Sequence, residues 1–461
     1  MFCDGIYFID DYIANGIILL SLPRMISSTR NSLTGALVFL HRCQPRAQQR
    51  QLGICLRLFS SSSPDIDAAV NYTSDFKIKG PIVAQLWTAR LEAKQKAATE
   101  TIDMDRPRSP SESVTKFTYD FKKDGFLAER YRNPFGHLRF GKVLEDLDAL
   151  AGNIAFGHVQ DPSVDIVTAS VDKIKLSGLP HLENNQHMSG KVTYVGTSSM
   201  EIRMQCKCDG VDEDPWMEAY FTFVAVNRET KRPMVIPPLA PQTWLEKDQF
   251  EAGQRRAQKR KEARKKSKNF EWAHNSEVDK LAVKLLQEAG PLKNIPGLAD
   301  PNSILMEHTK LQNCEIAQPS TANLANQIFG GFLMRRAFDL AWATAYVFAG
   351  CRPRFMEVDE VAFTIPVNVG DLTNFQAQVI YADVHDEVRG FNIYHGQKNI
   401  PLVSIEVYAW VVEPEKASAK LSNKFTYTFA VDSGTNIRKV LPANMEDARK
   451  MAIQVGNRRT V

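Results

Sequence analysis

The stretch NQIFGGFLMRRAFDLAWATA, residues 326–345, places a polar loop and two glycines before an apolar run. A second stretch, RFGKVLEDLDALA at residues 139–151, has the same outline but carries an acid where the first carries a phenylalanine. In both, apolar residues recur at helical spacing, so each stretch predicts a helix that begins beside a glycine. What these two helices do together decides the fold prediction.

Runs that alternate apolar and polar residues follow each helix. They occupy residues 166–176, 187–208 and 215–227 after the first helix, and 355–367, 372–396 and 401–413 after the second. This alternation is typical of half-buried antiparallel strands. The run at 187–208 contains a Gly-Thr-Ser turn and therefore predicts two strands.

The two halves of the chain repeat each other. In the strands, one spacing relates Val192 to Val379 and also Asp172 to Asp359, and in the helices a nearly equal spacing relates Gly141 to Gly331. A nearly constant offset indicates a duplicated unit of one long helix and about four strands. Because the apolar face of an antiparallel sheet must be covered, each unit predicts an α+β fold with a curled sheet wrapped around a central helix.

The predicted units are residues 114–236 and 301–415. A helical or loose leader, residues 64–113, precedes the first unit, so ordered structure is expected to begin near Val114. A charged linker, 237–300, joins the units, and 416–461 form a C-terminal extension. The basic run at 253–268 predicts a solvated linker helix, with a patch for an anionic ligand or partner as the alternative. Nucleic acid is disfavoured because aromatic residues do not interleave the basic ones.

Residues 1–63 predict a mitochondrial transit segment. Between Met25 and Ser63 the chain holds several serines, no acidic residue and five arginines, namely Arg30, Arg42, Arg46, Arg50 and Arg57. RLFSS at 57–61 is similar to a matrix-processing site. Acidic residues interrupt the segment 1–24, so Met25 is the expected start. The apolar run at 13–22 is too short to span a membrane, and stable membrane insertion is not expected.

The composition is that of an ordinary globular protein, with 44% hydrophobic and 24% charged residues in 461. A net charge of +4 is too small to indicate nucleic-acid binding. Seven cysteines show no disulfide-like spacing, and Cys206 and Cys208 have no second pair with which to form a zinc site. The sequence therefore predicts neither a metal nor a cofactor, and packing cysteines in a reducing compartment.

The IFGGFLMR stretch, the downstream RPRFMEVDEVAFTIPVNVGDL and the earlier RFGKVLEDLD resemble the acyl-CoA thioesterases with two tandem hot-dog domains, most closely the mitochondrial branch. The resemblance covers about residues 115–430. It implies two hot-dog domains, hydrolysis of the acyl-CoA thioester at their interface, and a homo-oligomer.

Asp148 lies at the border of the apolar face of the first helix, where a carboxylate costs desolvation free energy unless it has a task. The resemblance implies a catalytic aspartate on this helix. Asp148 could activate water as a general base or attack the thioester directly. An exposed carboxylate is the competing interpretation, and it fits the neighbouring Glu145 and Asp146 better.

The two glycines before the second helix allow a backbone to approach the thioester closely. The amides at Gly330 and Gly331 are expected to hold the developing oxyanion. The resemblance places a polar residue that orients the carbonyl or the water in the preceding loop, where the candidates are Asn323, Asn326 and Gln327. It also implies basic residues for the CoA phosphates after the helix, at Arg352 and Arg354.

Other classes of protein fit less well. A serine α/β-hydrolase needs a G-x-S-x-G elbow, which the chain lacks. A hot-dog hydratase or dehydratase would need a catalytic histidine, and His137 and His158 fall in no such motif. A non-catalytic acyl-CoA sensor remains a further alternative.

The repeat predicts that the two interfaces differ. The spacing of Gly141 and Gly331 maps Asp148 to Phe338, Asn323 to Asn133 and Gln327 to His137. Phenylalanine can neither take a proton nor attack a carbonyl. Asp339 follows Phe338, but one residue turns a helical side chain by about 100°. The sequence therefore predicts one working site per chain, at Asp148.

Overall fold

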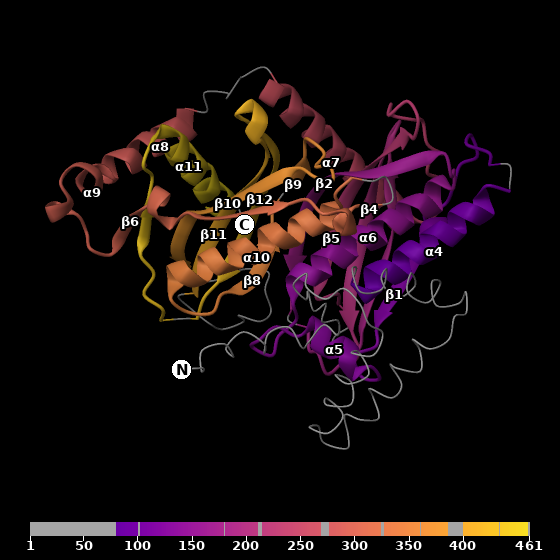
Figure 1. Cartoon of the computed structure of the whole chain (residues 1–461), viewed down its shortest axis with the longest axis horizontal. Coiled ribbons are helices and arrows are strands. Elements are labelled where there is room, and N and C mark those ends of the chain that lie inside the picture. The colour runs from indigo at the N-terminus through magenta and orange to yellow at the C-terminus, as the bar shows by residue number, and fades with distance from the viewer. Residues whose placement is uncertain are drawn as a thin grey trace, which may run out of the picture. The chain divides into compact units, whose positions relative to one another are not determined.

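A computed structural model describes residues 80–99, 102–178, 180–210, 214–268, 276–323, 327–359, 361–385, 400–432 and 434–459 (Figure 1). The predicted transit segment, residues 1–63, lies outside these residues. In the part of the chain that the structure describes, no helix is both long and apolar enough to cross a membrane.

The two predicted central helices are α6 (Phe140–Val159) and α10 (Gly330–Ala349), each of 20 residues. The first residues of the two helices, and also their last residues, are related by the same spacing as Gly141 and Gly331. Each helix ends at a residue in the left-handed conformation, Gln160 after α6 and Gly350 after α10. The duplicated helices therefore match from first residue to cap.

The strands that carry the duplication form one sheet of eleven strands among the described residues. The first repeat supplies β1 (Thr115–Tyr119), β2 (Val164–Leu176), β3 (Gln186–Val195), β4 (Ser199–Cys208) and β5 (Met217–Asn227). The second supplies β7 (Leu311–Ile316), β8 (Arg354–Val358), β9 (Val361–Phe363), β10 (Leu372–His385), β11 (Ile400–Glu413) and β12 (Ser418–Ala430).

The order of strands shows the duplication directly. It runs β1-β3-β4-β5-β2 and then, reversed, β8-β12-β11-β10-β7, while β9 pairs with both β2 and β12. Antiparallel pairing of β2 with β8 joins the halves. Both repeats also share a register shift, between Val192 and Tyr194 in β3 and between Val379 and Tyr381 in β10. The fold is therefore two tandem hot-dog domains, as predicted, built on one continuous sheet.

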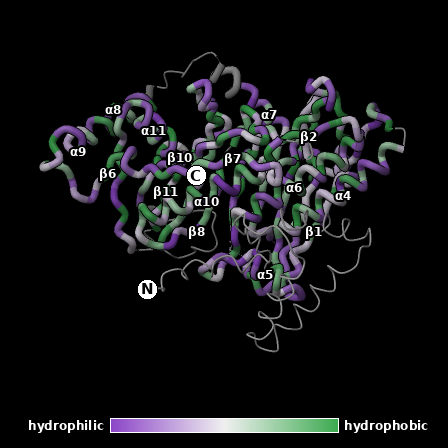
Figure 2. The backbone as a smooth tube through the Cα atoms, viewed as in Figure 1, coloured by the Kyte–Doolittle hydropathy of each residue, from purple (hydrophilic) through white to green (hydrophobic). Residues whose placement is uncertain are grey.

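The core lies between this sheet and the two central helices. Figure 1 shows α10 over strands of the second repeat and α6 beside those of the first. One buried apolar cluster contains residues of both helices and of both halves of the sheet. Figure 2 shows the hydrophobic residues gathered along these elements. The two helices also contact each other, and the start of α10 lies beside Asp148 of α6.

Three further helices are α7 (Trp244–Lys268), which packs on β3, and α8 (Ser276–Glu288) and α11 (Met445–Arg459), which pack on each other. The basic run forms α7, as predicted, but α7 is more than a solvated linker. Arg256 donates to buried Glu201 at 3.0 and 2.6 Å, and Arg260 pairs with Asp172. Part of the basic charge therefore docks α7 on the first repeat.

Two expected boundaries need correction. Ordered structure begins before Val114, because α4 (Pro81–Ala97) buries Ile82, Val83, Leu86 and Trp87 in the main core. The second unit does not end at residue 415, because β12 pairs with β11 on one side and β8 on the other. A domain boundary at residue 415 would cut β12, an internal strand, out of the sheet. The remaining α-helices and strands among the described residues are α5 (Gly125–Tyr131), α9 (Gly290–Asn294), β6 (Ser303–Leu305) and β13 (Lys439–Leu441).

Candidate active site

Asp148 lies on α6 and is buried, with 2% of its surface exposed. Thr168 of β2 donates its hydroxyl to Oδ1 at 2.8 Å. The amide of Gly331, at the start of α10, donates to Oδ2 at 2.7 Å. One carboxylate is thus fixed by a strand of its own repeat and a helix of the other.

Burial raises the pKa of Asp148 to about 6 from a usual 3.8. The hydrogen bonds from Thr168 and Gly331 and the positive charge of Arg90 oppose that rise, because each stabilises the ionised form. The carboxylate is consequently ionised at neutral pH while remaining a better proton acceptor than an exposed aspartate.

The other acids of this helix are not the exposed carboxylates expected from the sequence. Asp146 is buried and accepts hydrogen bonds from the Tyr119 hydroxyl at 2.7 Å and the Tyr131 hydroxyl at 2.5 Å. Glu145 is mostly buried and pairs with Arg335 of α10 at 3.0 Å. The expectation failed because the partners come from other elements, which helix periodicity does not reveal.

The double glycine permits a close helix contact. A Cβ atom at Gly331 would lie 2.9 Å from both Cα and the carbonyl oxygen of Glu145. At Gly330 it would lie 3.1 Å from Asp148 Oδ2. Gly331 therefore lets α10 approach α6, and its amide is occupied by Asp148. The Gly330 amide makes no hydrogen bond with another described residue, and Gly330 lines the adjacent cavity.

Asn323 lines the same small cavity of about 30 Å³, beside Asp148, Thr168 and Gly330. The Asn323 side chain also accepts the Gln327 amide at 3.1 Å. Gln327 pairs through its backbone with Asn368 and is not among the residues that line the cavity. Asn326 lies outside the described residues.

The sequence prediction missed the wall supplied by α4. Trp87 and Arg90 line the cavity, and Trp87 packs edge-on against Phe329 with ring centroids 5.3 Å apart. Burial lowers the pKa of Arg90 to about 10, and its Nε atom has no hydrogen-bond partner within the described part of the chain. The apolar pairs of α4, at Ile82 with Val83 and Leu86 with Trp87, are the signal that could have revealed a buried helix.

The remaining predicted residues lie elsewhere. Arg354 lines a second cavity, formed where α10 meets the loop before α6. Arg352 stacks over the Phe135 ring of that loop, with its guanidinium carbon 4.2 Å from the centroid. Neither arginine borders the Asp148 cavity. Across the described ranges, no group of three or more His, Cys, Asp or Glu side chains is arranged to hold a metal ion, and Cys206 and Cys208 are free thiols.

Comparison with known proteins gives several curated relatives. The chain is 39% identical over 391 residues to acyl-coenzyme A thioesterase 4, mitochondrial, of Humulus lupulus, covering 80% of this chain and 72% of the relative. It is 33% identical over 333 residues to acyl-coenzyme A thioesterase 9, mitochondrial, of Homo sapiens, covering 66% and 75%.

Among solved structures, an acyl-CoA hydrolase from Staphylococcus aureus is 26% identical, with a TM-score of 0.31 over 36% of this chain and 94% of that one. No family model matches the chain.

Proposed function

Because the chain belongs to the acyl-CoA thioesterases, enzymes that hydrolyse the thioester of acyl-CoA, we propose that Asp148 is the general base of that hydrolysis, acting between the two repeats. The supporting observation is the carboxylate held at once by Thr168 and by the Gly331 amide of the other repeat. Such a base can assist the reaction by roughly 10²–10⁴-fold.

The cavity beside Asp148 supports this role. Its volume of about 30 Å³ is enough for a water molecule but not for an acyl-CoA. A water held there would have Asp148 as an acceptor and the Asn323 side chain as a neighbour. The thioester would enter from the cavity mouth, which requires the surrounding side chains, including those of α4, to move apart.

In the proposed reaction, Asp148 takes a proton from the water as the water oxygen bonds to the thioester carbonyl carbon. The Gly330 amide, at the first residue of α10 and without a hydrogen-bond partner among the described residues, stabilises the resulting oxyanion. The C–S bond then breaks, the proton passes to the leaving CoA sulfur, and the products are a carboxylic acid and CoA.

The runner-up is direct attack of Asp148 on the thioester. A single turnover in H₂¹⁸O, with enzyme in excess and rapid quenching, separates the two. General-base catalysis predicts one ¹⁸O in the acid and neither label nor acyl adduct on the peptide that contains Asp148. A covalent acyl adduct or ¹⁸O in that peptide would instead establish the nucleophile.

Relatives named as mitochondrial support a mitochondrial location for this chain. The matrix is our more specific proposal, and it rests on the arginine-rich, acid-free composition of residues 25–63. A fluorescent reporter fused to residues 25–65 should enter the matrix. A diffuse cytosolic signal would overturn the proposal.

A further inference from the structure

The second interface retains a cavity but has lost the polar pair of the first. Thr168 of β2 and Phe355 of β8 occupy equivalent positions in the two repeats. Thr168 pairs with Phe223 of β5, and Phe355 pairs with Phe429 of β12. The helix offset matches Asp148 with Phe338. Where Thr168 donates to Asp148, Phe355 instead packs edge-on against Phe338, with ring centroids 5.1 Å apart. A carboxylate and its donor have thus been replaced by an apolar contact.

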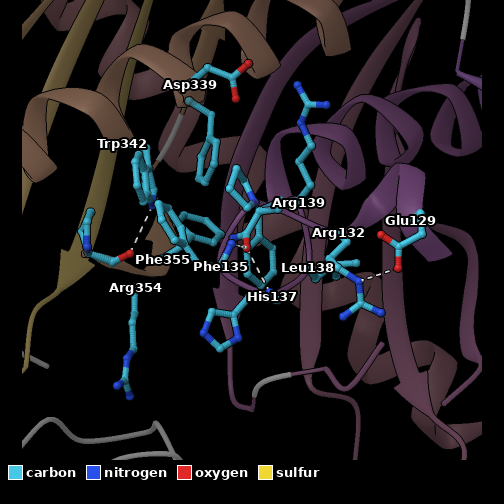
Figure 3. A pocket seen from close by; sticks show the side chains of 16 residues that line it. Glu129, Arg132, Phe135, His137, Leu138, Arg139, Asp339, Trp342, Arg354 and Phe355 are labelled. Atoms are coloured by element: carbon cyan, nitrogen blue, oxygen red, sulfur yellow. Dashed lines mark hydrogen bonds and ion pairs between the residues drawn. The ribbon is translucent and has the colours of Figure 1, made fainter. Parts of the chain in front are cut away.

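The cavity at this position is much larger than the one beside Asp148. Its volume is about 820 Å³, within the range of small-molecule sites. Figure 3 shows Trp342, Phe135 and Phe355 lying together along it. Phe135 and Trp342 are stacked, with centroids 5.7 Å apart and planes at 21°. These rings form one apolar wall of the cavity.

Basic side chains border this wall. Arg139, the residue before α6, lines the cavity with His137, and its positive charge acts on Asp339, which also lines the cavity. Arg354 also lines the cavity, and its guanidinium forms an ion pair with the exposed Asp432 at 2.9 Å. In Figure 3, Arg354 and His137 point toward one edge of the cavity. An apolar wall with a basic edge suits an anion that carries a long apolar chain.

We infer that this second cavity is a non-hydrolytic binding site for a long-chain acyl anion, either the free fatty acid or the intact acyl-CoA. The inference rests on the proposed function, because it assigns hydrolysis to Asp148 and retention to the site that has Phe338. Phenylalanine accepts no proton, so a chain bound there stays intact. Two acids also line the cavity, and both lie near arginines. Asp339 lies 4.0 Å from Arg335 and is acted on by the charge of Arg139, and Glu129 pairs with Arg132 at 2.8 Å.

The test uses the full chain with Asp148→Asn, so that bound acyl-CoA is not consumed. Cis-parinaric acid, a fluorescent long-chain fatty acid, is titrated into this protein, and palmitate, palmitoyl-CoA and CoA are then used as competitors. Trp342→Ala and Arg139→Glu are made in the same background. Their matched controls are Trp244→Ala and Arg232→Glu, which change exposed residues away from the cavity.

We expect saturable parinarate binding that weakens at least tenfold in both cavity variants and stays unchanged in both controls. If palmitate is the stronger competitor, the ligand of the cavity is the free fatty acid. If palmitoyl-CoA is the stronger competitor, the ligand is the intact thioester. Absence of binding, binding insensitive to both cavity variants, or full displacement by CoA alone would overturn the inference.

Trp342→Phe, which keeps an aromatic ring in the wall, separates loss of binding from loss of folding. It should bind parinarate nearly as tightly as the Asp148→Asn background, and both cavity variants should unfold at the parent urea midpoint. The proposed function fails separately, if the Asp148→Asn protein itself releases CoA thiol from acyl-CoA at the parent rate.

Discussion

Asp148 is poised between two opposing effects, since burial raises its pKa and two hydrogen bonds lower it. If Asp148 is the general base, kcat/KM should rise with pH as Asp148 loses its proton, with a midpoint near pH 6 on the acidic limb of the pH–rate profile. Thr168→Val removes a bond to the ionised form, which is worth about 1.5–3 kcal/mol, or roughly one to two pKa units. The limb should therefore move upward by that amount in a pH–rate profile.

Thr222→Val is the matched control for this experiment. Thr222 is a buried threonine on β5 whose hydroxyl has no partner among the described residues. Its replacement should leave the limb in place. A Thr168→Val profile that keeps the parent midpoint would show that Thr168 does not act on the base.

The buried Asp146 should make the free energy of unfolding depend on pH. Burial raises its pKa to about 7 from 3.8, against the hydrogen bonds from Tyr131 and Tyr119. Between these two values the folded state holds a proton that the unfolded state has lost, so the free energy of unfolding must fall as pH rises, by at most about 1.4 kcal/mol per pH unit.

Asp146→Asn removes this titration. Urea unfolding at pH 5 and pH 7 should show a smaller loss of stability with rising pH in Asp146→Asn than in the parent. Equal losses in the two proteins would mean that Asp146 is not protonated in the folded state.

For single residues, the sequence reveals the groups on one helix better than their partners. Helical spacing places Asp148 at the edge of the apolar face, and the structure puts it beside a cavity. The sequence does not reveal Thr168 as a partner of Asp148, because Thr168 lies on a strand whose register no local pattern specifies. Burial of Asp146 is equally hard to predict, since both of its tyrosine partners lie outside α6.

Among the elements, the crossing of α6 and α10 depends on the absence of a side chain at Gly331. An alanine there would press its Cβ against the Glu145 backbone, which cannot move aside as a flexible side chain would. Gly331→Ala should lower the free energy of unfolding by about 1–3 kcal/mol, as overpacking does. Urea unfolding measures the change.

Gly157→Ala is the control, because Gly157 also lies in α6 but has open space where its Cβ would be. There, alanine should raise stability by about 0.5–1 kcal/mol. Equal effects of the two substitutions would show that the helices do not need this close contact.

The elements that carry the repeat were predictable, and those that dock onto it were not. α6 and α10 follow from periodicity and a shared offset. α4 has only four buried side chains, and its sequence gives weak periodicity between charged residues. The sequence places β12 in a C-terminal extension, because the predicted unit ends with the strand before it. Pairing of β12 with β8 in the folded protein makes it an internal strand.

In the molecule as a whole, duplication followed by divergence explains why one sheet carries two unlike interfaces. One pairs Asp148 with Thr168 and a cavity of about 30 Å³, and the other pairs Phe338 with Phe355 and a cavity of about 820 Å³. The constant helix offset predicted this asymmetry. The larger cavity could not be predicted, because its volume depends on how side chains of both repeats pack. Assembly into a homo-oligomer stays a prediction.

A single hydrolytic site can be tested by comparing kcat/KM for acyl-CoA in Asp148→Asn and Asp339→Asn, because Asp148 of α6 lines the first cavity and Asp339 of α10 lines the second. We predict that Asp148→Asn loses roughly 10²–10⁴-fold and that Asp339→Asn keeps most of the parent value. If Asp148→Asn retains about half of the activity and only the double variant is inactive, the chain has two working sites and the single-site hypothesis is wrong.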